Sequence, residues 1–255
     1  MLTFIGLGLY DEHSITVAGQ AALRDADAVF AEFYTSRLVG TSVDDLESYH
    51  DVTIEVRDRA GVEREPDPIL AAAREGDAAF LTAGDTMIST THVDLRLRAH
   101  ERGIETRVIH APTAETAASS LTGLQNYRFG KATTLPFPWA HGADGVPGSV
   151  IDTLEDNLDR GLHTLVYLDI KAAKEEYMNA TTAADILRQH WNEDVLGVVV
   201  ARAGSPETVV RADSLLGLAN EDFGDPLHLL IVPGDLHHVE AEALRTLAGA
   251  PDALL

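Results

Sequence analysis

Residues 79–92, AFLTAGDTMISTTH, constrain the fold of this chain more than any other stretch. An apolar run that ends in Gly84-Asp85 predicts a buried strand and a tight loop, and the hydroxyl-rich residues after it predict the start of a helix. In open α/β folds the carboxyl ends of the strands bind ligands through free backbone N–H groups and loop side chains. We therefore expect any active site to be built around this loop. Asp85 is its strongest polar candidate, although a lone loop aspartate is more often a turn former or a helix cap.

Predicted strands and helices alternate along the first half of the chain. Helices are predicted at residues 14–25, 67–75 and 90–102, and Ser14 is the expected N-cap of the first. Strands are predicted at residues 2–6, 28–31, 52–56, 78–81 and 106–110. Alternation of this kind is typical of a mostly parallel sheet.

The second half has a different pattern. Helices are predicted at residues 114–121, 149–160, 181–190 and 239–248, and strands at residues 131–136, 164–169, 196–201, 208–210 and 227–232. Several of these strands follow one another without a helix between them, which favours a mixed sheet. Pro112 disfavours helix for the residue before it and marks a joint. We predict an α/β protein with an N-terminal lobe at residues 1–112, a C-terminal lobe at residues 113–255 and a cleft between them.

The charge balance is strongly acidic. The chain has 41 acidic and 19 basic residues, and its formal net charge is -22. Such a surface repels itself in dilute buffer, whereas at molar salt the Debye length is only about 3 Å and the repulsion is screened. We therefore expect a protein from a high-salt cytoplasm. No basic patch exists to displace counterions from phosphates, which argues against nucleic-acid binding.

Cysteine usage and hydropathy exclude further classes. The chain has no cysteine, so disulfides, thiolate zinc sites and cysteine nucleophiles are excluded. No run of eighteen apolar residues and no charged-then-apolar leader is present, so we expect a soluble cytoplasmic protein with no membrane partner.

The short motifs support several readings. Gly6-Leu7-Gly8 is half of a dinucleotide fingerprint, but Asp11 stands at the third glycine; a turn that needs positive φ explains the motif about as well as a ligand role. A metal site built from His237, His238 and Glu240 with His92 and His110 is disfavoured, because neighbouring side chains diverge and no ligand spacing such as His-Glu-x-x-His is present. No nucleophile elbow or phosphate-cradling loop is present. These residues alone indicate a two-lobed α/β enzyme with a loop-lined cleft.

A set of motifs in order along the whole chain closely resembles the diphthine synthases. They are FIGLGL at residues 4–9, GDTMISTTH at 84–92, LTGLQ at 121–125, LDIK at 168–171, ARAGS at 201–205, EDFGDP at 221–226 and VPG at 232–234. This family has the tetrapyrrole methylase fold and methylates, from S-adenosylmethionine, the amino group of a modified histidine on translation elongation factor 2. The resemblance implies a homodimer and no metal, and it assigns no catalytic residue.

The family's cofactor-contacting positions carry over by this resemblance. They fall on Leu9, Asp85, Ile88, Thr113, Ala114, Leu168, Ala203 and His237, which are expected to hold S-adenosylmethionine and its product S-adenosylhomocysteine in the cleft. The chain departs from the family at Thr86, where proline is common, and at Asp235, where lysine is usual. Two alternatives remain at this stage: a tetrapyrrole-precursor methylase of the same fold, and a non-enzymatic interaction module.

Overall fold

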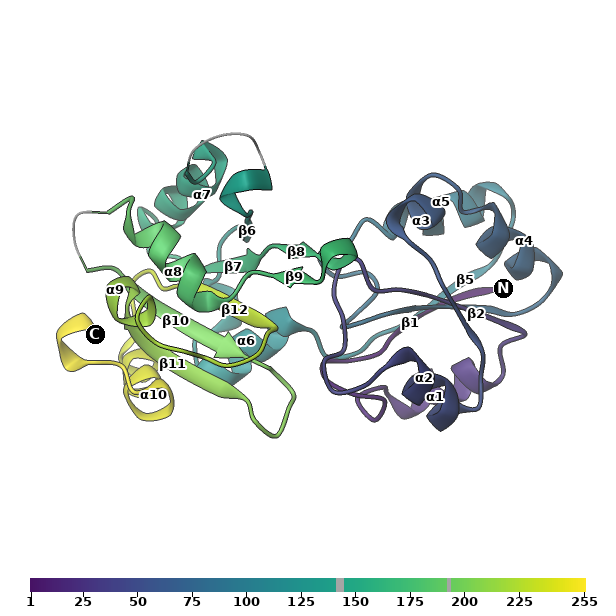
Figure 1. Cartoon of the computed structure of the whole chain (residues 1–255), viewed down its shortest axis with the longest axis horizontal. Helices are drawn as coiled ribbons and strands as arrows, with labels where there is room; N and C mark the ends of the chain where they lie inside the picture. Colours follow the sequence, from purple (N-terminus) through teal and green to yellow (C-terminus); the bar gives the residue numbers. More distant parts are fainter. Residues whose placement is uncertain (141–144, 192–193) are drawn as a thin grey trace. The chain divides into compact units, whose positions relative to one another are not determined.

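The computed structural model describes residues 1–140, 145–191 and 194–255. The chain divides into two compact units, which are described separately here (Figure 1). Unit 1 comprises Met1–Thr113 with Ala172–Lys174, and unit 2 comprises Ala114–Lys171 with Glu175–Leu255. No helix in these described ranges is long and apolar enough to cross a membrane.

Unit 1 is built on a five-stranded parallel sheet with the order β3-β2-β4-β1-β5. The strands are β1 Leu2–Gly6, β2 Ala28–Glu32, β3 Ile54–Val56, β4 Ala78–Thr82 and β5 Thr106–Ile109. Every residue of the central strands β1 and β4 is buried, because helices cover both faces of the sheet. This double cover explains why these strands are continuous apolar runs in the sequence.

Five helices cover the two faces of this sheet. They are α1 Val17–Arg24, α2 Val43–His50, α3 Arg59–Glu63, α4 Asp67–Glu75 and α5 Val93–Glu101. Helices α1 and α2 pack on one face around Leu23 and Leu46, and α3, α4 and α5 pack on the other around Ile69 and Leu95 (Figure 1). The α/β class and the parallel sheet predicted for this half are confirmed.

Several predicted details of unit 1 are wrong. The N-cap of α1 is Thr16, whose hydroxyl accepts from the Gly19 N–H, whereas Ser14 accepts from the N–H groups of Tyr10 and Asp11 in the preceding turn. Helices α2 and α3 were not predicted. They are short and lie at the surface, so few of their residues carry the apolar periodicity on which the prediction depends.

Unit 2 contains a mixed sheet, as predicted, and its strand order is β11-β10-β12-β7-β6. Its strands are β6 Thr133–Leu135, β7 Thr164–Leu168, β10 Leu196–Ala201, β11 Val209–Ser214 and β12 His228–Val232. Only β6 and β7 pair in parallel; the other pairs are antiparallel. A separate hairpin is formed by β8 Ile170–Lys171 and β9 Glu176–Tyr177.

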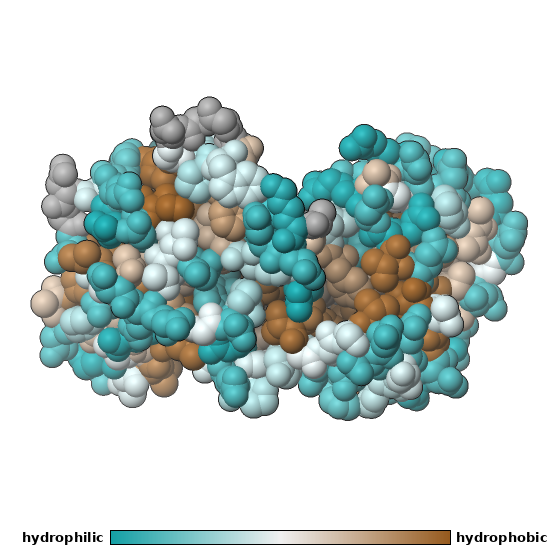
Figure 2. All heavy atoms as spheres, viewed as in Figure 1, coloured by the Kyte–Doolittle hydropathy of each residue, from teal (hydrophilic) through white to brown (hydrophobic). Residues whose placement is uncertain are grey.

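Helices cover both faces of this second sheet. They are α6 Ala114–Thr122, α7 Gly148–Leu158, α8 Ala180–Arg188, α9 Leu215–Leu218 and α10 His238–Ala248. Unit 2 also has 3-10 turns at Asn126–Arg128, Pro138–Ala140 and Asp252–Leu254, and the 3-10 turn Ala172–Lys174 belongs to unit 1. Helices α7, α8 and α9 pack on one face, and α6 and α10 pack on the other. Figure 2 shows hydrophilic residues over much of the visible face of each unit, in keeping with the acidic composition.

Candidate functional site

Two loops meet at the carboxyl edge of the unit 1 sheet. Strands β1 and β4 are parallel neighbours, so the loops after Gly6 and after Thr82 leave the sheet side by side. The Leu7 N–H donates to the Thr82 carbonyl over 2.9 Å. Gly8 and Gly84 then donate to each other's carbonyls, over 3.2 Å from Gly8 and 2.7 Å from Gly84. The backbones of the two loops are therefore held together.

Glycine is required in both loops for geometric reasons. A Cβ atom on Gly6 would lie 2.5 Å from the carbonyl oxygen of Gly84, so a side chain there would push the loops apart. Gly84 has φ +72°, in the left-handed region that favours glycine, and a Cβ atom there would meet only the Cα atom of Thr113, at 4.0 Å. The Gly6-Leu7-Gly8 motif thus serves loop packing, and open space remains beside Gly84.

Asp85 is buried, with its side chain only 3% exposed, and it accepts three hydrogen bonds. The Met87 N–H donates to Oδ1 over 2.9 Å, and the Ala111 N–H donates to Oδ2 over 3.2 Å. The Nδ1 atom of His110 lies 2.8 Å from Oδ2. Asp85 therefore joins its own loop to the end of β5.

The remainder of the Asp85 loop is fixed through the Thr86 carbonyl. This oxygen accepts from the Thr90 hydroxyl over 2.7 Å and from Nδ1 of the buried His92 over 3.1 Å. Burial lowers the pKa of His92, although the nearby carboxylate of Glu32 opposes that effect. A neutral ring that donates from Nδ1 has a lone pair on Nε2, so this atom makes no hydrogen bond although Oε1 of Glu32 lies 3.3 Å away.

Glu32 lies at the carboxyl end of β2 and is fully buried. Its carboxylate accepts from the backbone N–H groups of Tyr34 and Thr35, over 2.9 Å and 3.0 Å, and from the Thr35 hydroxyl. These donors compensate for burial of the charge. Glu32 thus orders the residues that follow β2, and His92 supports the Asp85 loop from the side of the core.

The predicted cofactor positions in unit 1 are Leu9, Asp85, Ile88 and Thr113. Leu9 and Asp85 belong to the paired loops described above, and Thr113 borders the space beside Gly84. Ile88 follows in the second loop, and its side chain is 43% exposed. The unit 1 fold thus gathers three of these positions around the paired loops and keeps an apolar side chain accessible nearby.

The other four predicted positions lie in unit 2. Ala114 opens α6. Leu168 ends β7, and Ala203 follows β10; both strands run antiparallel to β12, so their carboxyl ends share one edge of the sheet. His237 follows β12 and therefore leaves from the opposite edge. The topology of unit 2 accordingly brings Leu168 and Ala203 to a common edge and His237 to the other.

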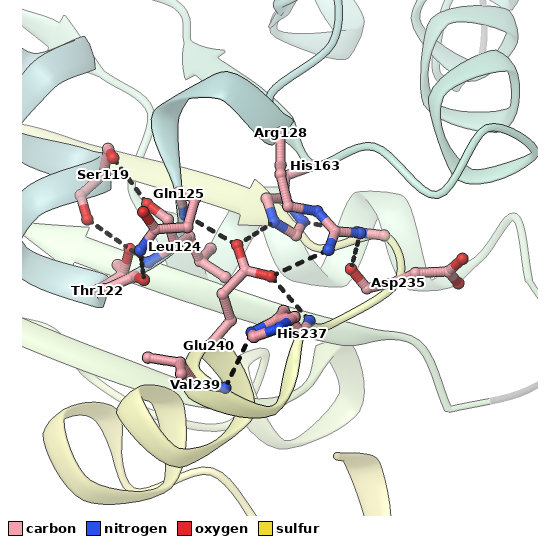
Figure 3. Close-up of polar contacts among 12 residues, drawn as sticks. Ser119, Thr122, Leu124, Gln125, Arg128, His163, Asp235, His237, Val239 and Glu240 are labelled. Carbon is pink, nitrogen blue, oxygen red and sulfur yellow. Dashed lines mark hydrogen bonds and ion pairs between the residues drawn. The ribbon is translucent and has the colours of Figure 1, made fainter.

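His237 is the N-cap residue of α10, where its Nδ1 atom accepts from the Val239 N–H over 3.4 Å. Its own N–H donates to Oε2 of Glu240 over 2.8 Å. Glu240 is fully buried and also accepts from the Gln125 N–H over 2.8 Å and from His163 Nε2 over 3.0 Å. Figure 3 shows these groups converging on the Glu240 carboxylate, with the Arg128 guanidinium 3.6 Å away.

The protonation of this cluster follows from its hydrogen bonds. Burial alone would raise the pKa of Glu240, but the N–H groups of Gln125 and His237 and the ring of His163 lower it below the ordinary value. The Gly234 N–H donates to Nδ1 of His163, so Nε2 carries the proton and donates to Glu240. Burial lowers the pKa of His163 and keeps it neutral.

Reasoning from the sequence missed the partners of these groups. It identified Asp85 but not His110 as its partner, it gave no role to Glu32 or His163, and it considered Glu240 only as part of a disfavoured metal site. His110 lies 25 positions from Asp85, and His163 and Gln125 lie 77 and 115 positions from Glu240, and no local pattern indicates such pairs. Within the described residues, no group of three His, Asp or Glu side chains is arranged to hold a metal ion.

Comparison with known proteins supplies the family. A family model described as "Tetrapyrrole (Corrin/Porphyrin) Methylases" matches residues 1–217. "Diphthine synthase" of Halobacterium salinarum is 72% identical over 260 residues, which cover 100% of both chains. The chain belongs to the diphthine synthase family.

More distant relatives agree with this assignment. "Diphthine synthase" of Methanosarcina acetivorans is 47% identical over 264 residues, covering 100% of this chain and 98% of the relative. A crystal structure of diphthine synthase matches with a TM-score of 0.92 at 37% identity, covering 99% of this chain and 98% of that one. The chain is therefore a methyltransferase of the diphthine synthase type, and the tetrapyrrole methylase fold is confirmed.

Proposed function

We propose that this chain transfers methyl groups from S-adenosylmethionine to the amino group of the modified histidine on translation elongation factor 2, in diphthamide biosynthesis. Full-length similarity to diphthine synthases, at 72% identity in one relative, carries the proposal. A tetrapyrrole-precursor methylase is the weaker alternative, because both curated relatives named above are called diphthine synthase and their similarity covers the whole of this chain.

The loops of unit 1 suit such a cofactor. Gly84 lacks a side chain beside Thr113, which leaves room for a ligand next to backbone groups, and the accessible Ile88 offers an apolar surface for a base. The Asp85 carboxylate already accepts three hydrogen bonds. Asp85 accordingly shapes the loop, and backbone groups of residues 84–88 meet the cofactor.

The cofactor positions in this proposal are those that the resemblance implies. They are Leu9, Asp85, Ile88, Thr113, Ala114, Leu168, Ala203 and His237. The protein works as a homodimer in a cytoplasm of high salt, where its net charge of -22 is screened. It requires neither nucleic acid nor a membrane.

The chemistry needs few catalytic groups. The bound sulfonium supplies a methyl group that is already a strong electrophile, so the protein has to align donor and acceptor and exclude water. Such orientation supplies up to roughly 7–11 kcal/mol of the barrier. The acceptor nitrogen must also lose its proton before it can attack.

Mass spectrometry of elongation factor 2 tests the proposal. The archaeal factor that carries the 3-carboxy-3-aminopropyl histidine precursor is incubated with this protein and S-adenosylmethionine at molar salt. Mass gains in methyl steps at that histidine are expected. No gain, with cofactor binding demonstrated by calorimetry, would contradict the proposed acceptor and retain the methyltransferase assignment.

A further inference from the structure

His110 combines a buried anchor with an accessible ring. Its Nδ1 atom lies 2.8 Å from Oδ2 of Asp85, and the two side chains are 74% and 3% exposed respectively. A histidine held in this way has a fixed orientation, yet one edge of its ring remains open to a reacting group.

The hydrogen bonds of Asp85 determine which nitrogen of His110 carries the proton. Asp85 accepts from the N–H groups of Met87 and Ala111, so each of its two oxygens already acts as an acceptor. A carboxylate can only accept, so Nδ1 of His110 donates to it. In the neutral ring Nε2 therefore carries the lone pair, and it is the atom able to accept a proton.

The position of His110 suits a role in transfer. It directly follows β5 Thr106–Ile109, which pairs in parallel with β1, so it leaves the same edge of the sheet as the Gly6 and Gly84 loops. The Ala111 hydrogen bond to Asp85 fixes the adjacent backbone. A protein-borne acceptor that approaches these loops from solvent can therefore reach the ring.

The other histidines of unit 1 lack this combination. His50 and His92 are buried. His13 lies with Nε2 3.4 Å from its sequence neighbour Glu12, and Nε2 of His100 lies 3.0 Å from the Thr106 hydroxyl. Among the described residues of unit 1, His110 is thus the one histidine whose ring is exposed and whose Nδ1 atom bonds a buried carboxylate.

We propose that His110 is the general base of methyl transfer and that Asp85 is its positioning residue; this inference rests on the proposed function. Nε2 of neutral His110 takes a proton from the acceptor ammonium and becomes imidazolium. The amine lone pair then forms the N–C bond to the methyl group, while the C–S bond breaks and its electron pair returns to sulfur. The positive charge thus passes from sulfonium to the methylated nitrogen, and His110 releases its proton to water before the next transfer.

Three variants test this assignment in steady-state kinetics of methyl transfer at molar salt. His110→Gln removes the base, and kcat is expected to fall by about 10²- to 10⁴-fold. Asp85→Asn presents an amide that donates to Nδ1 and moves the ring proton to Nε2, so a comparable loss is expected. His100→Gln, which changes another exposed histidine of unit 1, is the matched control and should retain wild-type kcat.

Two further measurements separate catalysis from folding and cofactor binding. The Kd of S-adenosylmethionine, measured by calorimetry, should stay within about twofold of wild type in His110→Gln. Added imidazole should restore part of the activity of His110→Ala, because it replaces the missing base. The inference would be overturned if His110→Gln retained wild-type kcat. It would also be overturned if the loss of kcat were fully matched by a loss of cofactor binding and imidazole gave no rescue. Neither result would contradict the proposed function. A wild-type protein that transfers no methyl would overturn the proposed function as well.

Discussion

His163 donates from Nε2 to Oε1 of Glu240 over 3.0 Å, and both side chains are fully buried. The pair lies 77 positions apart in the chain and joins the residues before β7 to the first turn of α10. Through Gln125 and Gly234 it also fixes the LTGLQ and VPG motifs. Two of the sequence signatures are therefore explained by a shared structural role around one carboxylate.

Replacement of Glu240 by glutamine should be strongly destabilising. Its NH2 group would replace one of the two oxygens and would face either the Gln125 N–H and His163 Nε2 or the His237 N–H, which themselves donate. A buried donor without an acceptor costs about 1–3 kcal/mol. We expect the free energy of unfolding at molar salt to fall by roughly 3 kcal/mol in Glu240→Gln, because a buried charged partner of His163 and Arg128 is also lost. Denaturant titration followed by circular dichroism measures this change.

The matched control is Glu242→Gln on the same helix. Glu242 is exposed and pairs with Arg245, so its removal should cost less than about 1 kcal/mol. Equal losses in the two variants would contradict the role assigned to the Glu240 cluster.

Acid should destabilise the folded protein. Burial lowers the pKa of His50, His92, His163 and His228. Below the ordinary histidine pKa of about 6.5 the unfolded chain takes up protons that the folded chain does not, so stability is complete above that pH and is lost as the pH falls. Each histidine contributes a slope of up to about 1.4 kcal/mol per pH unit.

Unfolding titrations between about pH 7.5 and pH 5 measure this slope. Molar salt is needed throughout, because it screens the general repulsion of the acidic surface, which itself changes with pH. The variant His228→Gln should have a shallower slope than wild type, and a stability independent of pH over this range would contradict the neutral state of these rings.

Gly6→Ala should damage the paired loops. The new Cβ atom would lie 2.5 Å from the Gly84 carbonyl, so the loops have to separate and the Gly8–Gly84 hydrogen bonds weaken. We expect the affinity for S-adenosylmethionine to fall by at least about tenfold, equivalent to about 1.4 kcal/mol. Calorimetry measures it, with Gly148→Ala as control, because a Cβ atom there has no described neighbour within 4 Å.

Salt should stabilise this protein. Between about 0.1 M and 1 M the Debye length falls from about 10 Å to about 3 Å, which screens repulsion among 41 acidic residues. The midpoint of thermal unfolding should therefore rise with sodium chloride concentration. Calorimetric scans test this, and a midpoint that falls with added salt would contradict the high-salt assignment.

The fold was predictable where its signal is local. The strands β1, β4, β10 and β12 are continuous apolar runs, and α4 was predicted with the bounds that the structure has. Short surface elements such as α2 and α3 were missed, because few of their residues face the core. The Asp85 loop was identified because a strand end followed by Gly-Asp is itself a local pattern.

The interactions within the candidate site were not predictable in the same way. Asp85 contacts His110, which lies beyond the crossover from β4 to β5, and Glu240 accepts a hydrogen bond from Gln125, which lies 115 positions earlier in the chain. Such pairs depend on strand order and register, which one sequence does not specify. The resemblance to diphthine synthases supplied the family and the proposed cofactor positions, and the structure supplied the hydrogen-bond partners.

The mutual hydrogen bonds of Gly8 and Gly84 hold the two loops together as one rigid unit in the absence of a ligand. A ligand that binds them loses little affinity to ordering of the backbone, because the conformational entropy of both loops was already given up on folding. Because the loops are bonded to each other, a substitution that moves the loop after β1 also displaces the loop after β4. On the proposed cofactor site, affinity is thus set partly by a pair of glycines that contributes no side chain to the ligand.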